Sequence, residues 1–118
     1  MKRTVYALLA FVLMLAPTAS AQSTVRMTVD APTAHATVPA AFLIGGWAFD
    51  PGAGVGAGVD AVHVWAYPAG GGAGVFLGPA AIGGERLDIV ESYGVHSAGF
   101  GLNAPAVLPP GPYVLRVF

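Results

Sequence analysis

GGWAFDPGAGVGAGVDAVHVWAY, residues 45–67, holds two aromatic-rich apolar runs separated by a loop made almost wholly of glycine, alanine and valine. Both runs alternate and are rich in β-branched and aromatic side chains, which is typical of strands. The loop is too short for a helix, so we expect the two runs to form neighbouring antiparallel strands. The stretch therefore predicts an all-β fold, and it contains no catalytic motif.

Residues 1–21 have the pattern of a cleaved secretory signal peptide. Lys2 and Arg3 form a basic start, an apolar run covers residues 5–16, and residues 19–21 (Ala-Ser-Ala) supply the small side chains that signal peptidase requires. The run is about 12 residues long, against about 20 needed to span a bilayer, so we expect cleavage rather than a membrane anchor. The predicted product is secreted, periplasmic or attached to the cell surface, with no membrane span after cleavage.

Residues 22–118 are long enough for one domain with one core and too short for two. The chain has no cysteine, so this domain folds without disulfides and a lipid anchor has no attachment point. Without Lys2 and Arg3, three arginines face six carboxylates, and no lysine is left. This charge excludes the basic surface that binds nucleic acid and the basic helix that lies on membranes.

Alternation predicts about six strands after residue 22. They cover residues 24–30, 42–50, 59–67, 75–82, 99–103 and 113–118. Trp47 is the largest predicted core residue. In the third strand we expect one face to carry Val62, Val64 and Ala66, and the other to carry His63, Trp65 and Tyr67. In the last strand we expect Tyr113, Leu115 and Val117 to be buried and Arg116 to point outward.

The segments between these strands carry turn and loop signals. Two prolines place a loop over residues 31–39, and residues 51–58 form the glycine loop. Residues 85–93 are the one helix-like piece, a possible short helical turn that Gly94 would close. Strands at this spacing favour an antiparallel β-sandwich, with a small barrel as the main alternative.

The order of several short motifs resembles a bacterial Ig-like domain that recurs in exported and cell-surface proteins. The motifs are residues 46–50 (GWAFD), 58–68 (GVDAVHVWAYP), 76–78 (FLG), 86–89 (RLDI), 93–94 (YG), 97–100 (SAGF) and 108–113 (LPPGPY). This resemblance implies an Ig-like antiparallel β-sandwich and a role as a spacer or adhesion module. It carries no known catalytic residues.

The segment that ends at Tyr113 is similar to the tyrosine corner of Ig-like sandwiches, in which the hydroxyl bonds back to nearby backbone. Domains of this pattern usually continue into a closing strand, whereas this chain stops at Phe118. We therefore expect a sheet edge with unpaired backbone. Three explanations stand: a C-terminally truncated product, a pairing site completed by a strand from another chain, or a complete minimal fold.

Metal sites have little support in the sequence. His35, His63 and His96 are the only histidines, and no pair of them has the spacing of zinc ligands. Residues 56–62 match most of a calcium-binding nonapeptide, a motif that works in tandem copies, and this chain has one copy. Asp50 and Asp60, at the two ends of the glycine loop, could bind calcium. Alternatively, both accept backbone hydrogen bonds there. We expect no metal and no cofactor.

Catalytic motifs are equally incomplete. Residues 99–104 fit a loose dinucleotide fingerprint, but the prolines from Pro105 onward exclude the helix that it needs. Ser97 lies in a segment one glycine short of a nucleophile elbow. Asp88 and Glu91 are three residues apart, as on an exposed acidic helix face. No nucleophile, base and orienting group come together, so we predict that the protein is not an enzyme.

Two functions from different classes follow. The first is a non-enzymatic exported module that acts as a structural, protein-interaction or adhesion element, with protein partners that add a strand at an exposed sheet edge. The alternative is a carbohydrate- or ligand-binding sandwich in which Trp65 and Tyr67 form an exposed platform for a cell-surface glycan.

Overall fold

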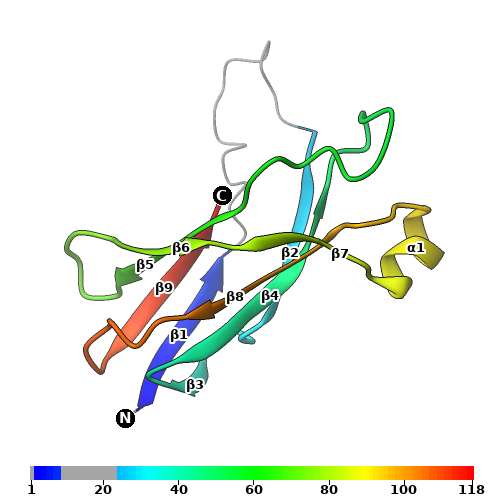
Figure 1. Ribbon diagram of the computed structural model, residues 1–118. Helices are drawn as coiled ribbons and strands as arrows, with labels where there is room; N and C mark the ends of the chain where they lie inside the picture. The colour runs from blue at the N-terminus through cyan, green and yellow to red at the C-terminus, as the bar shows by residue number, and fades with distance from the viewer. Residues whose placement is uncertain (1, 9–23) are drawn as a thin grey trace.

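The computed structural model describes the backbone of residues 2–8 and the whole of residues 24–118, which form strands and one short helix (Figure 1). In chain order the elements are β1 (Lys2–Leu8), β2 (Arg26–Ala31), β3 (Ala36–Pro39), β4 (Phe42–Phe49), β5 (His63–Pro68), β6 (Val75–Pro79), β7 (Ala81–Gly84), α1 (Leu87–Tyr93), β8 (Gly99–Ala104) and β9 (Pro112–Val117). Residue 1 and residues 9–21 of the predicted signal peptide lie outside the described residues, and its cleavage stays a prediction.

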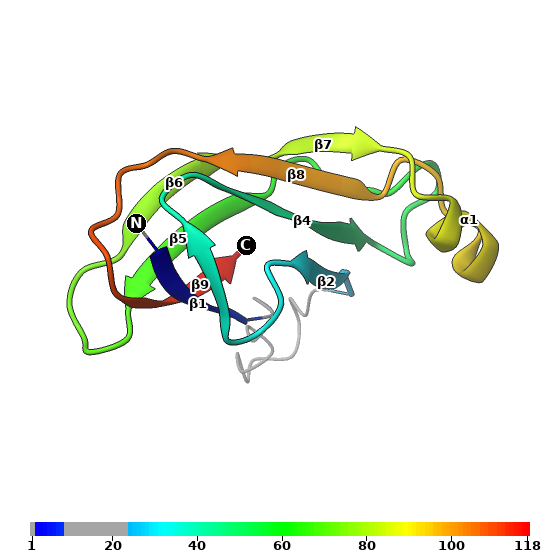
Figure 2. The same ribbon diagram turned by 90° about the horizontal axis from the view of Figure 1, so that it is seen from below.

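The strands form two sheets. One is antiparallel with the order β2-β4-β8-β7. The other contains the antiparallel set β9-β5-β6, extended on the β9 side by β1 and then β3. Figure 2 shows β7 and β8 along the upper layer and β1 and β9 in the lower one. The prediction of an all-β, sandwich-like class is confirmed at this level.

The core lies between the two sheets and follows the predicted alternation. In β5 and the residue before it, the inward side chains of Val62, Val64 and Ala66 are almost completely buried. In β9, Tyr113, Leu115 and Val117 are buried, and Arg116 is exposed as expected. The facing sheet contributes Met27, Phe42, Ile44, Ala48, Phe100 and Ala104. One apolar face per sheet is thus buried against the other, which is the organising feature of a sandwich.

The two runs that flank the glycine loop are not neighbours, which corrects the first expectation. β4 belongs to the four-stranded sheet, whereas β5 pairs with β6 and β9 in the other. Each strand has one apolar face, and the chain buries both by facing β4 and β5 across the core, where Ile44 and Val64 are fully buried. The loop is therefore a crossover between sheets.

The predicted strand over residues 75–82 is also divided between the sheets. β6 pairs with β5, while β7 pairs with β8. Pro79 has no N–H to continue a ladder, and the next residue, Ala80, is buried and donates its N–H to the Val62 carbonyl at 2.8 Å. The chain changes sheets at this point.

The expected loop over residues 31–39 contains a strand, β3. The unpaired edge at the last strand is expected for residues 22–118, and within the described part of that range, residues 24–118, β9 pairs with β5 alone; its second partner, β1, belongs to the predicted signal peptide. β9 pairs with β5 on one side and with β1 on the other, and β1 in turn pairs with β3. The backbone of residues 2–8 therefore forms the hydrogen bonds along the second side of β9.

Within the described residues no helix has the length and apolar character that crossing a membrane requires.

Trp47 lies outside the main core, contrary to expectation. It alternates with the inward residues of β4 and therefore lies on the outer side of the sheet, where it stacks on Phe49 and contacts Tyr93 at centroid distances of 5.6 and 5.8 Å. The helix α1, inside the predicted residues 85–93, covers this cluster and buries Ile89. Gly94 ends the helix in the left-handed conformation, with φ of 70°.

The tyrosine corner is present. The Tyr113 hydroxyl donates to the carbonyl of Pro109 at 2.5 Å, four residues upstream. We expect Tyr113→Phe to lower the free energy of unfolding by about 1 kcal/mol, since a part-buried carbonyl loses its donor while the ring stays in the core. Chemical denaturation measures this. An unchanged midpoint would show that the bond contributes nothing to stability.

Candidate functional site

An outward row of aromatic side chains is the most distinctive surface of the described chain. It is built by His63, Trp65 and Tyr67 on β5, Phe76 on β6 and Arg116 on β9, and we call it the aromatic face. Because the even-numbered residues of β5 fill the core, period-two alternation places the odd-numbered ones on the outside. Trp65 and Tyr67 are partly exposed, and Phe76 is 44% exposed.

Strand register assembles these residues into a transverse row. Trp65 lies opposite Arg116 on one side and opposite Phe76 on the other. The pairing of β5 with β6 shifts between Val64 and Trp65, so that Phe76 rather than Leu77 lies opposite Trp65. Gly78, at φ of 134°, lies in this irregularity, where a residue without Cβ is favoured.

The rings contact one another closely. The centroids of Trp65 and Phe76 are 5.1 Å apart, and those of Trp65 and Tyr67 are 6.4 Å apart with an angle of 26° between their planes. His63 meets Phe76 edge-on at 5.5 Å. The Arg116 guanidinium lies 5.2 Å from the centre of the Tyr67 ring, within cation–π range. The result is an apolar surface with one cation at its side.

The absence of a side chain at Gly74 leaves room for the Tyr67 ring. A Cβ at residue 74 would overlap the ring, whereas a Cβ at Gly70 would meet nothing within 4 Å. We expect Gly74→Ala to displace Tyr67 and to change the ring signals of Tyr67 and Trp65, with a loss of stability near 1 kcal/mol. Side-chain NMR measures the displacement. Gly70→Ala is the matched control, and equal spectra for the two variants would contradict the packing described here.

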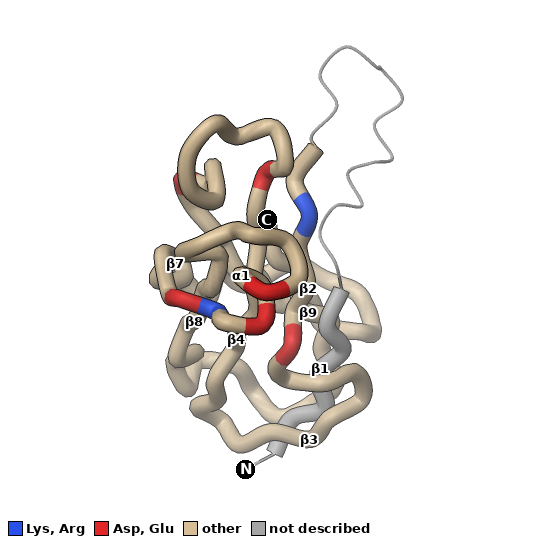
Figure 3. Tube along the Cα trace, turned by 90° about the vertical axis from the view of Figure 1, so that its right-hand side faces the viewer, with Lys and Arg blue, Asp and Glu red and all other residues tan. Residues whose placement is uncertain are grey.

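Most charges gather elsewhere, around α1 and the ends of β2 and β7 (Figure 3). Arg86 Nη1 donates to Asp30 Oδ2 at 2.7 Å. Arg86 Nε and Nη2 donate to the two carboxylate oxygens of Asp88 at 3.0 and 2.7 Å. The hydrogen bonds from Arg86 hold the pKa of Asp88 below its usual value, and those to Asp88 and Asp30 raise the pKa of Arg86. These ion pairs tie the start of α1 to β2. Within residues 24–118, by contrast, no carboxylate forms an ion pair with Arg116.

Glu85, His96 and Ser97 meet on the other side of α1. His96 Nδ1 lies 2.8 Å from one Glu85 oxygen, and the Ser97 backbone N–H donates to the other oxygen at 2.9 Å. These are the residue types of a hydrolase triad. However, Ser97 enters through its backbone, and among the described residues its hydroxyl makes no bond to His96, so the nucleophile–base contact of such a triad is missing. These hydrogen bonds join the residues before α1 to the residues after it, and we call this arrangement the α1 clip.

We expect acid to weaken the hydrogen bonds of the α1 clip. Bonds from His96 and from the Ser97 N–H lower the pKa of Glu85 below its ordinary value of 4.5. A carboxyl with a depressed pKa in the folded state stabilises above its unfolded pKa, and this stabilisation is lost as pH falls through the folded value. We therefore expect hydrogen exchange at the Ser97 amide, corrected for intrinsic rate, to accelerate below about pH 4.5. Glu85→Gln should flatten that profile, and the same profile in both proteins would refute the assignment.

The loop aspartates are placed differently from each other. Asp50 accepts hydrogen bonds from the Thr24 hydroxyl and from the Gly52 N–H, the latter at 2.8 Å, and both lower its pKa. The alternative role of a loop-end acceptor thus holds for Asp50, while Asp60 is exposed. Among the described residues no three His, Asp or Glu side chains form a group that could hold a metal ion. His35 and His63 lie in separate places, on the loop before β3 and on β5.

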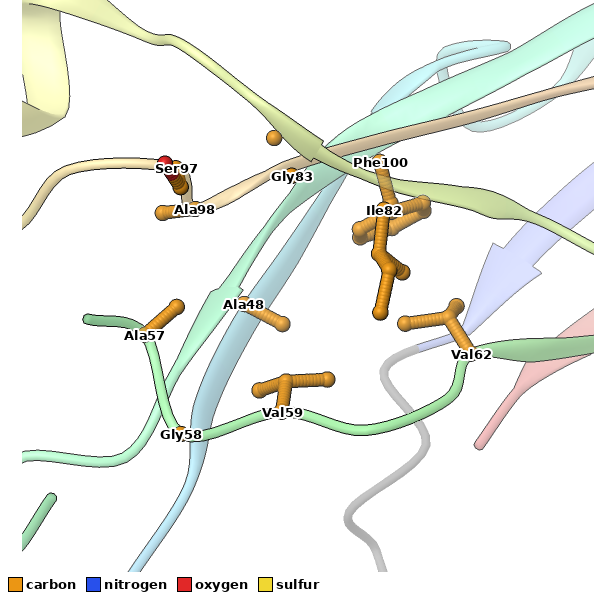
Figure 4. Close-up of a pocket in the computed structure, with 11 residues that line it drawn as sticks. Ala48, Ala57, Gly58, Val59, Val62, Ile82, Gly83, Ser97, Ala98 and Phe100 are labelled. Atoms are coloured by element: carbon orange, nitrogen blue, oxygen red, sulfur yellow. The ribbon is translucent and has the colours of Figure 1, made fainter. Parts of the chain in front are cut away.

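A small pocket opens at the end of the sandwich nearest the crossover loop (Figure 4). Val59, Val62 and Ile82 point into it, with Ala48 and Phe100 behind, and its volume is about 170 Å³. Ser97 is its one lining residue with a polar side chain. An apolar pocket with so few polar groups has little with which to orient a ligand. Residues 99–104, which carried the loose dinucleotide fingerprint, form strand β8 beside it.

Sequence reasoning identified part of the aromatic face. The sequence predicts that Trp65 and Tyr67 share a face of their strand, and the structure places them together on the outer side of the sheet. Phe76 was missed as a member, and Arg116 was expected outside but not linked to the rings. Two alternating runs joined by the turn at residues 69–74 form a hairpin, and this hairpin is the signal that predicts Phe76 opposite Trp65.

Comparisons with protein-family models, with curated proteins and with solved structures found no match for this chain.

Proposed function

We propose that this chain is a non-enzymatic, exported interaction module of bacterial Ig-like type, and that it binds a protein partner through the aromatic face. The aromatic face itself carries the proposal. Tryptophan, tyrosine and arginine dominate the binding energy of protein interfaces, and here all three lie together on one sheet. Two packed sheets and the tyrosine corner support the Ig-like assignment. The pattern of residues 1–21 supports export.

The face also defines the chemistry of the partner. Its rings offer an apolar surface, and Arg116 adds a cation that forms no ion pair within the described chain. A partner with an apolar patch beside a carboxylate would satisfy both features. Such a contact would cover the exposed rings and give Arg116 a carboxylate partner.

Charge reversal tests this proposal. The immobilised chain is exposed to extracts of the cells that produce it, and retained proteins are compared with those on Arg116→Glu. The amount of partner protein retained should fall tenfold or more, because the glutamate at residue 116 would repel the carboxylate proposed on the partner. Arg26→Glu, an exposed arginine on β2 of the other sheet, is the matched control and should retain the same proteins. Equal retention by both variants would overturn the role of the aromatic face.

A second candidate function rests on one observation. The planes of Trp65 and Tyr67 are only 26° apart, which suits stacking on the flat faces of sugar rings. The chain has two tryptophans, so Trp47→Phe leaves Trp65 as the only indole reporter. Soluble cell-surface oligosaccharides should then shift the fluorescence of this variant if the face binds glycan. A protein-only face would leave the emission unchanged at millimolar sugar.

A further inference from the structure

The first strand of the chain lies inside a sheet. Residues 4–8 of β1 run parallel to β9, and residues 2–5 run antiparallel to β3. The order β3-β1-β9 gives this strand backbone partners on both sides. Among the described strands, β3 pairs with β1 alone. Figure 1 shows β1 beside β9, with β3 beyond it.

Cleavage at the predicted site, after residue 21, would remove this interior strand. Residues 36–39 of β3 and 112–116 of β9 would then face each other as two edges. Neighbouring strands are about 5 Å apart, so the gap would be about 10 Å wide, the space of one strand. Unpaired backbone groups along both edges favour the addition of a new strand. We call this gap the β3–β9 slot.

Register defines what the slot accepts. Residues opposite one another in paired strands share a face, and Val38, Tyr113 and Leu115 face the core. The positions opposite them are those of residues 3, 5 and 7. An occupant therefore needs apolar residues at three alternate positions. The resident strand has arginine at the first, a residue type that is costly at a core-side position.

We propose that the β3–β9 slot is a strand-acceptor site. Its occupant in the exported protein is an extended segment of another protein, parallel to β9, with apolar residues at the three core-side positions. In the uncleaved chain the backbone of residues 2–8 fills the slot, and after cleavage the slot accepts a strand with an apolar residue at each of the three core-side positions. This proposal rests on the interaction role proposed above, but it uses a sheet edge rather than the aromatic face.

Peptide exchange tests the proposal. A protease site is placed after residue 21 in the full chain, and the folded protein is cut. Three labelled seven-residue peptides are then titrated by fluorescence anisotropy: residues 2–8 unchanged, the same peptide with Arg3→Val, and that peptide with Val5→Pro added. We expect Arg3→Val to bind at least tenfold more tightly than the unchanged peptide. Val5→Pro should abolish binding, because an interior strand uses every N–H on one side or the other.

Hydrogen exchange locates the bound peptide. Protection should rise at residues 36–39 and 112–116, and should not change at β2. Equal binding of the Val5→Pro peptide, protection elsewhere, or displacement of the peptide by a second copy of the cut chain would overturn the proposal. If the cut chain unfolds, the Arg3→Val peptide should restore its β circular dichroism, and failure to do so overturns it too. Loss of the slot alongside Arg116-dependent partner retention would leave the proposed function standing.

Discussion

Replacing Gly46 with alanine is expected to lower the free energy of unfolding by about 3 kcal/mol, the upper end for overpacking a core. The new Cβ would overlap the backbone carbonyl of Thr28 on β2 and would come within 2.9 Å of Cζ of Phe100. Neither neighbour can withdraw easily, since one is ladder backbone and the other a core ring. The strand β2 would have to separate from β4. Thermal and chemical denaturation measure the loss.

Gly45→Ala is the control for this prediction. It changes the adjacent glycine on the same strand, where a Cβ would meet the Phe100 carbonyl at 3.5 Å, an ordinary contact. We expect a loss below about 1 kcal/mol there, with the same gain in strand propensity as at residue 46. Equal effects at the two positions would mean that β2 and β4 do not approach each other as described.

Replacing Trp65 with alanine is expected to weaken binding of the retained partner about thirtyfold, which corresponds to the 2 kcal/mol of a hot-spot residue. Trp65 is the centre of the aromatic face, because it contacts both Tyr67 and Phe76. Its side chain lies outside the core, so the fold should persist with a loss near 1 kcal/mol from the missing cross-strand pair. Surface plasmon resonance with the captured partner measures the affinity.

The matched variant for Trp65 is Leu43→Ala. Leu43 is 58% exposed on β4, in the other sheet, so the substitution also removes exposed apolar area. It should leave the affinity unchanged. A similar loss from both variants would indicate general stickiness of the exposed apolar surface and would refute a specific role for the aromatic face.

Alternation predicted which residues share a face in β5 and β9 better than the sequence predicted which sheet each strand joins. Alternation placed Val62, Val64 and Ala66 on one face, and the structure shows that this is the buried face. Burial of one face imposes a period of two wherever the strand is placed. The tyrosine corner at Tyr113 was found for a similar reason. It needs only the local segment and a carbonyl four residues upstream.

Sheet membership could not be predicted in the same way. Whether β4 and β5 pair or face each other depends on the length and course of the crossover loop, and both arrangements bury the same residues. The division of residues 75–82 depends on Pro79, whose missing N–H is compatible with a strand end or an edge. Trp47 is predicted to be a core residue because it is large and apolar, although it alternates with the inward-facing residues of β4. It packs instead against the cluster beside α1, a contact that alternation along β4 cannot predict.

The aromatic face was half predictable. Trp65 and Tyr67 share a strand, so their phase was sufficient to place them together. Phe76 joins them because the register shift at Val64/Trp65 moves it into line, and Gly78 is the only sign of that irregularity in the sequence. Pairing of β1 with β3 and β9 was not expected at all, since residues 2–8 look like the start of a signal peptide.

Photo-cross-linking from the aromatic face tests the central claim most directly. A photoreactive phenylalanine analogue is placed at residue 76 or, as the control, at residue 43, and each chain is irradiated in extracts of the cells that produce it. Both positions are exposed, at 44% and 58%, but only residue 76 belongs to the aromatic face. The account predicts a discrete protein adduct at residue 76 that is absent at residue 43 and lost with Trp65→Ala. The same adducts from both positions, or adducts that persist without Trp65, would contradict it.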